Sequence, residues 1–385
     1  MKRKIMLVLM ALTLVFSSLA FVGCTDSDKD GYDDCFVIES GMITGLTAKG
    51  KTYSKLVIPN KIKGKSVTGI KSLAFADCDN LNKITIPMGI TVIENSALSG
   101  CKNLTQIIVD ESNPNYSSLD GNLYNKSKTT LLCYAIGKTA TSFTIPNSVE
   151  NVGVAAFSGS EFLQSVTIPS GVTSLSSGAF SMCSELTSIA LPTTLTTIGT
   201  YAFSRSGLTS LEIPNGVVTI NDYAFYDCND LQSISISSSL QSLGTSAFCS
   251  CDALTSITVD SENQYFSSLG GNLYNKTQTR IRQYAIGKTA TSFTLPNTVT
   301  SIGDRVFEDC KSITSIIIPS RVTSVGFYAF SECDNLTIYC EETSKPSGWS
   351  ISWNYSNCPV YWYSEAEPTI LGNYWHYVNG VVTIW

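Results

Sequence analysis

Cysteine is the residue type in this chain whose number and spacing most strongly suggest chemistry. The 385 residues include 13 cysteines, and seven of them stand three residues after a phenylalanine, or after Leu98, in a recurring segment. These seven are Cys78, Cys101, Cys183, Cys228, Cys251, Cys310 and Cys333. Ser160 and Ser206 take the same position in two other copies, and no C-x-x-C pair exists, which disfavours a thiolate metal cluster. We predict a column of small buried side chains instead.

Acidic residues near the N-terminus are the second group that could bind an ion. Asp26, Asp28, Asp30 and Asp34 form the pattern D-x-D-x-D-G-x-x-D, which resembles the calcium loops of thrombospondin-type repeats. Carboxylate oxygens around a glycine turn suit Ca²⁺. Val37 stands where an EF-hand places its last glutamate, which excludes an EF-hand. We favour a solvated acidic tether over residues 24–35, with a weak calcium site as the alternative.

Other catalytic or cofactor chemistry has little support in the sequence. His376 is the single histidine, and no serine-hydrolase, zinc-protease, phosphate-loop or dinucleotide motif appears in a fitting context. The formal net charge is -6 and the body of the chain has no basic run, which argues against nucleic acid as a partner. We predict no enzymatic activity, no cofactor and no resident metal.

The N-terminus reads as a targeting segment. Lys2, Arg3 and Lys4 precede an apolar stretch, which ends in Phe21-Val22-Gly23-Cys24. This ending resembles the lipobox of bacterial lipoproteins, in which the peptide is cut before a lipidated cysteine. We predict a signal peptide over residues 1–23 and lipidation of Cys24, which anchors the exported chain to the cell envelope. An ordinary signal peptide followed by a coincidental cysteine is the alternative.

A repeat positions the cysteines along the chain. Its pattern is I-P-x-x-V-T-x-I-G-x-x-A-F-x-x-C-x-x-L-x-S-I-x-I-P, and its prolines recur at a step of 23 residues, as in Pro146, Pro169 and Pro192. A fixed period of this length is typical of a solenoid, in which each copy buries an apolar face against its neighbours. We predict a mainly β solenoid over residues 59–339, and such a shape favours recognition over catalysis.

Each repeat contains two stretches of alternating apolar and polar residues. Leu186–Leu191 alternates until Pro192 ends it, and Leu195–Ile198 alternates until Gly199. Tyr201-Ala202-Phe203 is too short for a helix and predicts one helical or 3-10 turn that aims the ring inward. The coils then stack into narrow parallel sheets.

Two inserts, near residues 110–145 and 260–295, break the period in the same way. Residues 109–149 and 259–299 share 27 identities in 41 positions, so a unit of 150 residues is duplicated. Within each insert, two short apolar runs flank a polar turn, which predicts a hairpin projecting from the stack. We expect such a hairpin to add specificity. Replacing Leu119–Tyr134 or Leu269–Tyr284 by a plain turn would then weaken binding more than folding.

Both ends of the solenoid need cover for their exposed core. Residues 36–58 predict an N-terminal hairpin cap. Residues 340–385 contain all five tryptophans and predict an aromatic C-terminal cap. A platform for sugars is the alternative for these aromatic rings. Whether Cys340 and Cys358 form a disulfide there is left open.

With the repeat laid out, the chain resembles the BspA-type leucine-rich repeat family of bacterial surface proteins. The I-P…A-F-x-x-C copies, the G-N-L-Y-N-K and G-K-T-A-T-S-F inserts and the aromatic tail carry the resemblance, from about residue 36 to 385. It implies a curved, right-handed solenoid on the outer surface of a bacterium. It also implies adhesion or recognition of a host matrix protein or another cell. A lipoprotein that captures glycans for nutrient uptake is the alternative function. Expected partners are therefore a protein or glycan on host or neighbouring cells, with the membrane contacted only through the lipid anchor.

Overall fold

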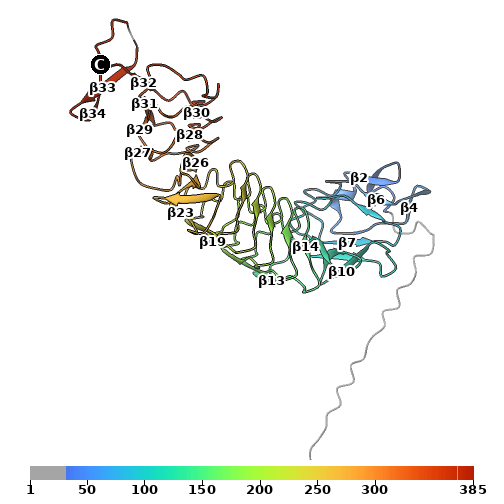
Figure 1. Cartoon of the computed structure of the whole chain (residues 1–385). Helices are drawn as coiled ribbons and strands as arrows, with labels where there is room; N and C mark the ends of the chain where they lie inside the picture. Colours follow the sequence, from blue (N-terminus) through green and yellow to red (C-terminus); the bar gives the residue numbers. More distant parts are fainter. Residues whose placement is uncertain (1–31, 371) are drawn as a thin grey trace, which may run out of the picture. The chain divides into compact units, whose positions relative to one another are not determined.

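The predicted parallel-stranded solenoid is confirmed. The computed structural model describes residues 32–370 and 372–385, which form a mainly β solenoid of about 14 stacked turns (Figure 1). Helix in these residues is limited to the 3-10 turn η1 (Gly50–Thr52), and none of them forms a helix long and apolar enough to cross a membrane. The predicted signal peptide, Cys24, Asp26, Asp28 and Asp30 lie outside the described residues.

The longer strands of the coils form one series of parallel sheets, which we call the long ladder. Strands pair in register, so that Val166 lies opposite Ile189 and Leu211 opposite Ile234. These apolar residues face the core, because side chains alternate between the two faces of a strand. The ladder consists of β3 (Lys55–Val57), β7 (Lys83–Ile86) and β9 (Gln106–Val109); β13 (Ser142–Thr144), β15 (Ser165–Thr167) and β17 (Ser188–Ala190); β19 (Ser210–Ile213), β21 (Ser233–Ile236) and β23 (Ser256–Val259); and β27 (Ser292–Thr294), β29 (Ser315–Ile318), β31 (Thr337–Cys340), β32 (Val360–Tyr363), β33 (Tyr374–Val378) and β34 (Val381–Ile384).

The two-residue strands of the repeat coils form a second series, the short ladder, together with the longer strands of the N-terminal hairpin and of the two inserts. Its strands are β1 (Phe36–Glu39), β2 (Met42–Leu46), β6 (Gly69–Ile70) and β8 (Val92–Ile93); β10 (Tyr116–Leu119), β11 (Asn122–Asn125), β12 (Thr130–Cys133), β14 (Asn151–Val152), β16 (Ser174–Leu175), β18 (Thr197–Ile198), β20 (Thr219–Ile220) and β22 (Ser242–Leu243); and β24 (Phe266–Leu269), β25 (Asn272–Asn275), β26 (Arg280–Gln283), β28 (Ser301–Ile302) and β30 (Ser324–Val325). The hairpin is β1–β2, and β2 pairs in parallel with β6. A separate small hairpin joins β4 (Lys61–Ile62) to β5 (Lys65–Ser66).

The Ala-Phe segment of each coil is a series of turns, where the sequence predicts a helical or 3-10 turn. Backbone hydrogen bonds of the i→i+3 type close successive turns around Phe203. Tyr201 and Arg205 have φ angles of 55° and 56°, whereas a 3-10 helix requires negative φ throughout. These left-handed residues turn the Phe203 N–H toward the next coil, where it donates to the Ala224 carbonyl at 2.8 Å. The turns therefore add a third set of hydrogen bonds between coils.

The repeat cysteines are buried and unpaired, as predicted, and they also have a bonding role that the sequence did not reveal. The Sγ of Cys183 donates to the carbonyl of Phe157 in the preceding coil at 3.2 Å, and other repeat cysteines make the same contact. The other contacts of this kind are Cys101 to Phe75, Cys228 to Phe203, Cys251 to Phe225 and Cys333 to Phe307. The thiol is thus a second donor to the Phe157 carbonyl, which also accepts the N–H of Ser160 at 3.0 Å, and it links one coil to the next.

The inserts do not project from the solenoid, and this part of the sequence prediction is wrong. Each is a three-stranded antiparallel unit, β10–β11–β12 or β24–β25–β26, whose last strand pairs in parallel with the next coil. Leu123, Tyr124 and Leu131 are fully buried. The apolar runs therefore belong to the core. Replacing Leu119–Tyr134 would remove these core residues, so we now expect it to damage folding before binding.

Each insert divides the solenoid at a junction. The short ladder stops at β8 and starts again at β10, and it stops at β22 and starts again at β24. The buried residues also fall into separate clusters on either side of each insert. We call the group β8, β10–β12 and β14 the first junction, and the group β22, β24–β26 and β28 the second junction.

The aromatic C-terminal segment keeps the path of the repeat for one more coil. Trp349 forms a parallel bridge with Val325, and β32 pairs in parallel with β31. β34 then turns back antiparallel on β33. Trp349 and Trp353 are buried within the last core cluster. Trp375 is also buried, but it packs against Tyr339 and Tyr363. Cys358 continues the cysteine column with its Sγ 3.8 Å from the Phe330 carbonyl, and it is not bonded to Cys340.

Candidate binding surfaces

The outward side chains of the long ladder form a strip of hydroxyl groups, which we call the hydroxyl face. Along β19, β21 and β23 the residues Ser210, Ser233 and Ser256 lie side by side in register. Adjacent strands are about 4.8 Å apart, so such hydroxyls repeat at the spacing of a ladder. Glu212 is the one charged residue facing outward from these three strands. With no histidine or second carboxylate among them, the strip is suited to hydrogen bonding along an extended ligand.

Aromatic rings replace the hydroxyls near the C-terminal end of the long ladder. Tyr339 and Tyr361 lie opposite one another with ring centroids 5.5 Å apart. Tyr363 and Tyr377 pack against the buried Trp375, with centroids 5.5 and 4.8 Å from the indole. Tyr377 is 40% exposed. We call the four tyrosines the tyrosine patch, and such rings can stack on an apolar face of a ligand.

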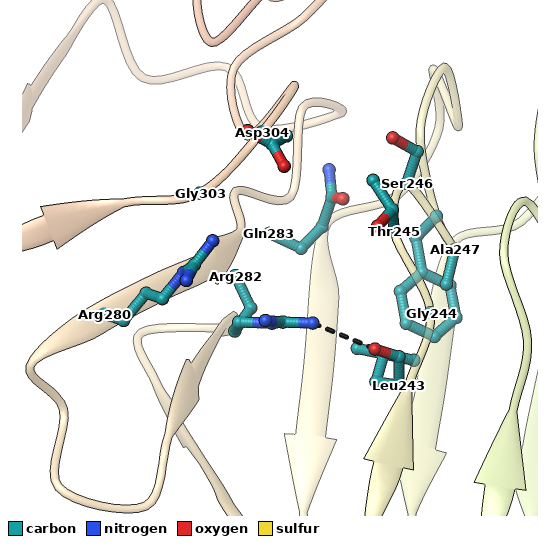
Figure 2. Close-up of a pocket in the computed structure, with 11 residues that line it drawn as sticks. Leu243, Gly244, Thr245, Ser246, Ala247, Arg280, Arg282, Gln283, Gly303 and Asp304 are labelled. Atoms are coloured by element: carbon teal, nitrogen blue, oxygen red, sulfur yellow. Dashed lines mark hydrogen bonds between the residues drawn. The ribbon is translucent and has the colours of Figure 1, made fainter. Parts of the chain in front are cut away.

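Each junction encloses a small cleft at its break in the short ladder. The first cleft has a volume of about 50 Å³, and Ile93, Leu132 and Val154 contribute to its apolar lining. The second has a volume of about 40 Å³ (Figure 2) and is lined by Leu243, Gly244, Thr245, Ser246, Ala247, Phe248, Arg280, Arg282, Gln283, Gly303 and Asp304. A cavity of this size holds a few water molecules or one small ion, and not a substrate of ordinary size.

Residues that are identical in the two inserts build the frame of both junctions. The buried Asn113 donates to two carbonyls of the preceding coil at 2.9 and 2.8 Å, and Asn263 makes the same two contacts. The Nζ of Lys138 donates to Asn122 Oδ1 at 2.7 Å, and Lys288 repeats this bond to its own asparagine. Burial lowers the pKa of both lysines. The shared motifs are therefore structural, so a difference in binding must come from positions at which the copies differ.

The positions that differ place cations in the second cleft. Because the unit repeats after 150 residues, Arg280 and Arg282 stand where the first insert has Thr130 and Leu132. These arginines belong to no motif, so they were not predicted as site residues. The sequence did contain a sign of them. When the two inserts are aligned, one strand of the second insert has arginine at two positions where the first insert has none.

A buried carboxylate lies in the same junction. Glu308 accepts hydrogen bonds from Arg305 and from the thiol of Cys249. Burial raises the pKa of Glu308, and burial together with this carboxylate raises the pKa of Cys249. Arg305 also lies 4.8 Å from the ring centroid of Tyr328. A thiol held protonated in this way is a poor nucleophile, so the cluster is a structural link between coils.

Of the sequence-predicted calcium ligands, only Asp34 lies in the described part of the chain, so the proposed loop stays a prediction. No group of three or more His, Cys, Asp or Glu side chains among residues 32–370 and 372–385 could hold a metal ion. Asp34 pairs with Lys63 at 3.2 Å on the surface. The ring of His376 lies 3.8 Å, centroid to centroid, from that of Trp385. Neither Asp34 nor His376 therefore belongs to a metal-binding cluster among the described residues.

Comparison with known proteins gives the following matches. A family model described as "BspA type Leucine rich repeat region" matches six copies, over residues 50–160, 132–255 and 279–347. A leucine-rich repeat protein from Eubacterium ventriosum is 23% identical with a TM-score of 0.54, over 65% of this chain and 77% of the other. A leucine rich cell surface protein from Faecalibacterium prausnitzii is 21% identical with a TM-score of 0.52, over 86% of both chains. At these identities, the two structures establish the fold alone. No curated protein matches the sequence.

Proposed function

The chain belongs to the BspA-type leucine-rich repeat family, and we propose that it is a surface-anchored recognition protein whose solenoid binds a macromolecular ligand. The ligand is a host matrix protein or a component of another cell. The hydroxyl face carries this proposal. It presents in-register serines over adjacent coils, whereas the two junction clefts are about 40 and 50 Å³ and too small for an ordinary substrate. We propose no catalytic turnover.

Anchoring through Cys24 completes the proposal. The similar chain from Faecalibacterium prausnitzii is described as a cell surface protein. The lipobox-like Phe21-Val22-Gly23-Cys24 provides the means of attachment in this chain, and residues 24–35 supply the tether. We propose location on the outer surface of the envelope, with the solenoid held away from the membrane.

A binding array tests the main function. The chain without residues 1–23 is applied to matrix proteins, bacterial surfaces and polysaccharides, and the ligand that binds is then titrated. Ser233→Arg places a bulky charge on the hydroxyl face, and we expect it to weaken binding about tenfold or more. Ser242→Arg is the matched control, because Ser242 is exposed in the same coil but belongs to the short ladder.

Two results would contradict the proposal. Equal affinity of wild type and Ser233→Arg for the ligand would place the binding site off the hydroxyl face. Chemical conversion of the bound ligand would contradict the absence of turnover.

The tyrosine patch favours a second candidate function, glycan capture for nutrient uptake. Tyr339 and Tyr361 stack on the outward side of the ladder, and rings of this kind can pack against sugar faces. If glycan capture is the function, neutral polysaccharides bind on the array. Tyr361→Ala then abolishes that binding, while Ser233→Arg leaves it unchanged. Binding that survives Tyr361→Ala would contradict this alternative.

A further inference from the structure

The second junction cleft differs from the first in charge. Its lining includes the guanidinium groups of Arg280 and Arg282 and a single carboxylate, Asp304. The first cleft has Leu132 in place of Arg282, and it includes the carboxylate of Glu94, which pairs with Lys71 at 2.8 Å. Duplication has therefore given one frame two different linings, one mainly apolar and one cationic.

The two arginines of the second cleft have no anionic partner in the described part of the chain. Neither guanidinium lies within 4.0 Å of a carboxylate there. The Nη2 of Arg282 donates to the carbonyl of Leu243 at 2.9 Å, and the Nε of Arg280 is buried without a hydrogen-bond partner. An oxygen of Asp304 is already taken by the N–H of Phe327 at 2.8 Å. Both arginines are half-buried. A guanidinium that is partly removed from water is stabilised by an opposite charge, so an anion is the expected complement.

The opposite wall of the cleft provides a second, independent observation. Ser246 is 9% exposed, and its hydroxyl is buried with no hydrogen-bond partner. Figure 2 shows the two arginines on one side of the cleft, Ser246 on the other, and the amide of Gln283 between them. Gln283 is also buried, and its Nε2 donates to the Tyr284 carbonyl at 3.0 Å. Three side chains that can donate hydrogen bonds, Arg280, Arg282 and Ser246, thus line this space, and Asp304 is its one carboxylate.

We propose that the second junction cleft binds one small oxyanion, such as a sulfate, phosphate or carboxylate group, between Arg280, Arg282 and Ser246. A volume of about 40 Å³ fits such a group and excludes a larger molecule, which could insert only its acidic group. Planar guanidinium groups suit oxyanions because they donate two parallel hydrogen bonds. This site is independent of the hydroxyl face, so it can be present whichever macromolecule the solenoid binds.

The duplicated unit supplies the variant for the test. Arg280→Thr with Arg282→Leu installs the side chains that the first junction carries on an equivalent frame, so folding should be retained. Sodium sulfate, sodium acetate and sodium chloride are titrated at matched ionic strength into both chains, each lacking residues 1–23. Thermal unfolding reports binding to the folded state. Sulfate also stabilises proteins by general exclusion, and that part acts equally on both chains.

We expect sulfate to raise the midpoint of wild-type unfolding saturably, beyond the rise in the double variant. Affinity in the variant should fall by about tenfold or more, since hydrogen bonds to charged groups are the stronger kind. An equal, unsaturable rise in both chains would overturn the proposal. Titration with glucuronic acid, with glucose as the uncharged control, then shows whether the site prefers a free inorganic anion or the acidic group of a sugar. Calorimetric binding of glucuronic acid alone, lost in the variant, would identify the sugar acid.

Discussion

The stacked phenylalanines are the feature whose removal should most clearly test the fold. Phe203 has no exposed surface, and its ring lies between those of Phe180 and Phe225, with centroids 5.4 Å away on each side and planes within 5° of parallel. Its neighbours belong to other coils and are held there by their own strands. Phe203→Ala would therefore leave a cavity that the column cannot close.

The expected loss of stability follows from the size of that cavity. Truncation of a buried phenylalanine to alanine costs about 3–5 kcal/mol. The lost ring contacts on both sides, each worth about 0.5–1.5 kcal/mol, place this site in the upper half of that range. Tyr201→Ala is the control, because Tyr201 belongs to the same coil but is 41% exposed. Its ring stacks on that of Tyr223, with centroids 5.0 Å apart. We therefore expect Tyr201→Ala to cost about 1–2 kcal/mol, less than half the cost of Phe203→Ala.

Chemical denaturation followed by circular dichroism measures both losses. Hydrogen exchange should accompany it, because a solenoid unfolds through coupled neighbouring coils and need not be two-state. Phe203→Ala should reduce protection in the coils of Phe180 and Phe225 more than in the distant coil of Phe330. A loss below about 0.5 kcal/mol, or uniform loss of protection along the chain, would refute the reasoning.

Three further predictions concern the cysteine column, its titration and the anchor. Cys183→Ser should change stability by less than about 1 kcal/mol, because serine occupies the equivalent position at Ser160 and Ser206 in two other coils. Cys183→Val should cost about 1–3 kcal/mol, because it places a branched side chain in a fully buried position and removes the thiol hydrogen bond to Phe157. Denaturation midpoints that rank the two variants in the opposite order would contradict this. Burial raises the pKa of Cys183 and of Tyr134 to about 12, from 9.0 and 10.0, so the unfolded chain loses these protons first. Stability should hold below pH 9 and fall between pH 9 and 12, and an unfolding free energy that stays level to pH 12 would count against the burial of these groups. A palmitate analogue should label the wild-type chain in cells, and Cys24→Ser should lose both label and membrane retention; label on the variant would reject Cys24 as the acceptor.

Some features of this protein could be read from the sequence because they repeat. The step of 23 residues, the alternation along Leu186–Leu191 and the cysteine column each depend on local periodicity. Periodicity is preserved when coils stack, since each coil meets a copy of itself in register. The solenoid, its parallel strands and its buried cysteines were therefore predictable.

Other features could be known only from the tertiary structure. They occur where the repeat is interrupted, or where neighbouring coils impose the backbone conformation. The left-handed φ angles of Tyr201 and Arg205 leave no trace in residue type, because the hydrogen bonds to the next coil impose them. The sequence predicted a projecting hairpin for each insert because two apolar runs around a polar turn have the same pattern in a projecting hairpin and in a buried one. Only packing shows that Tyr124 and Leu131 face the core. Likewise, Arg280 and Arg282 become a pair facing Ser246 only because the backbones of β22 and β26 do not pair as strands. Their separation leaves a cleft between coils that the sequence keeps far apart.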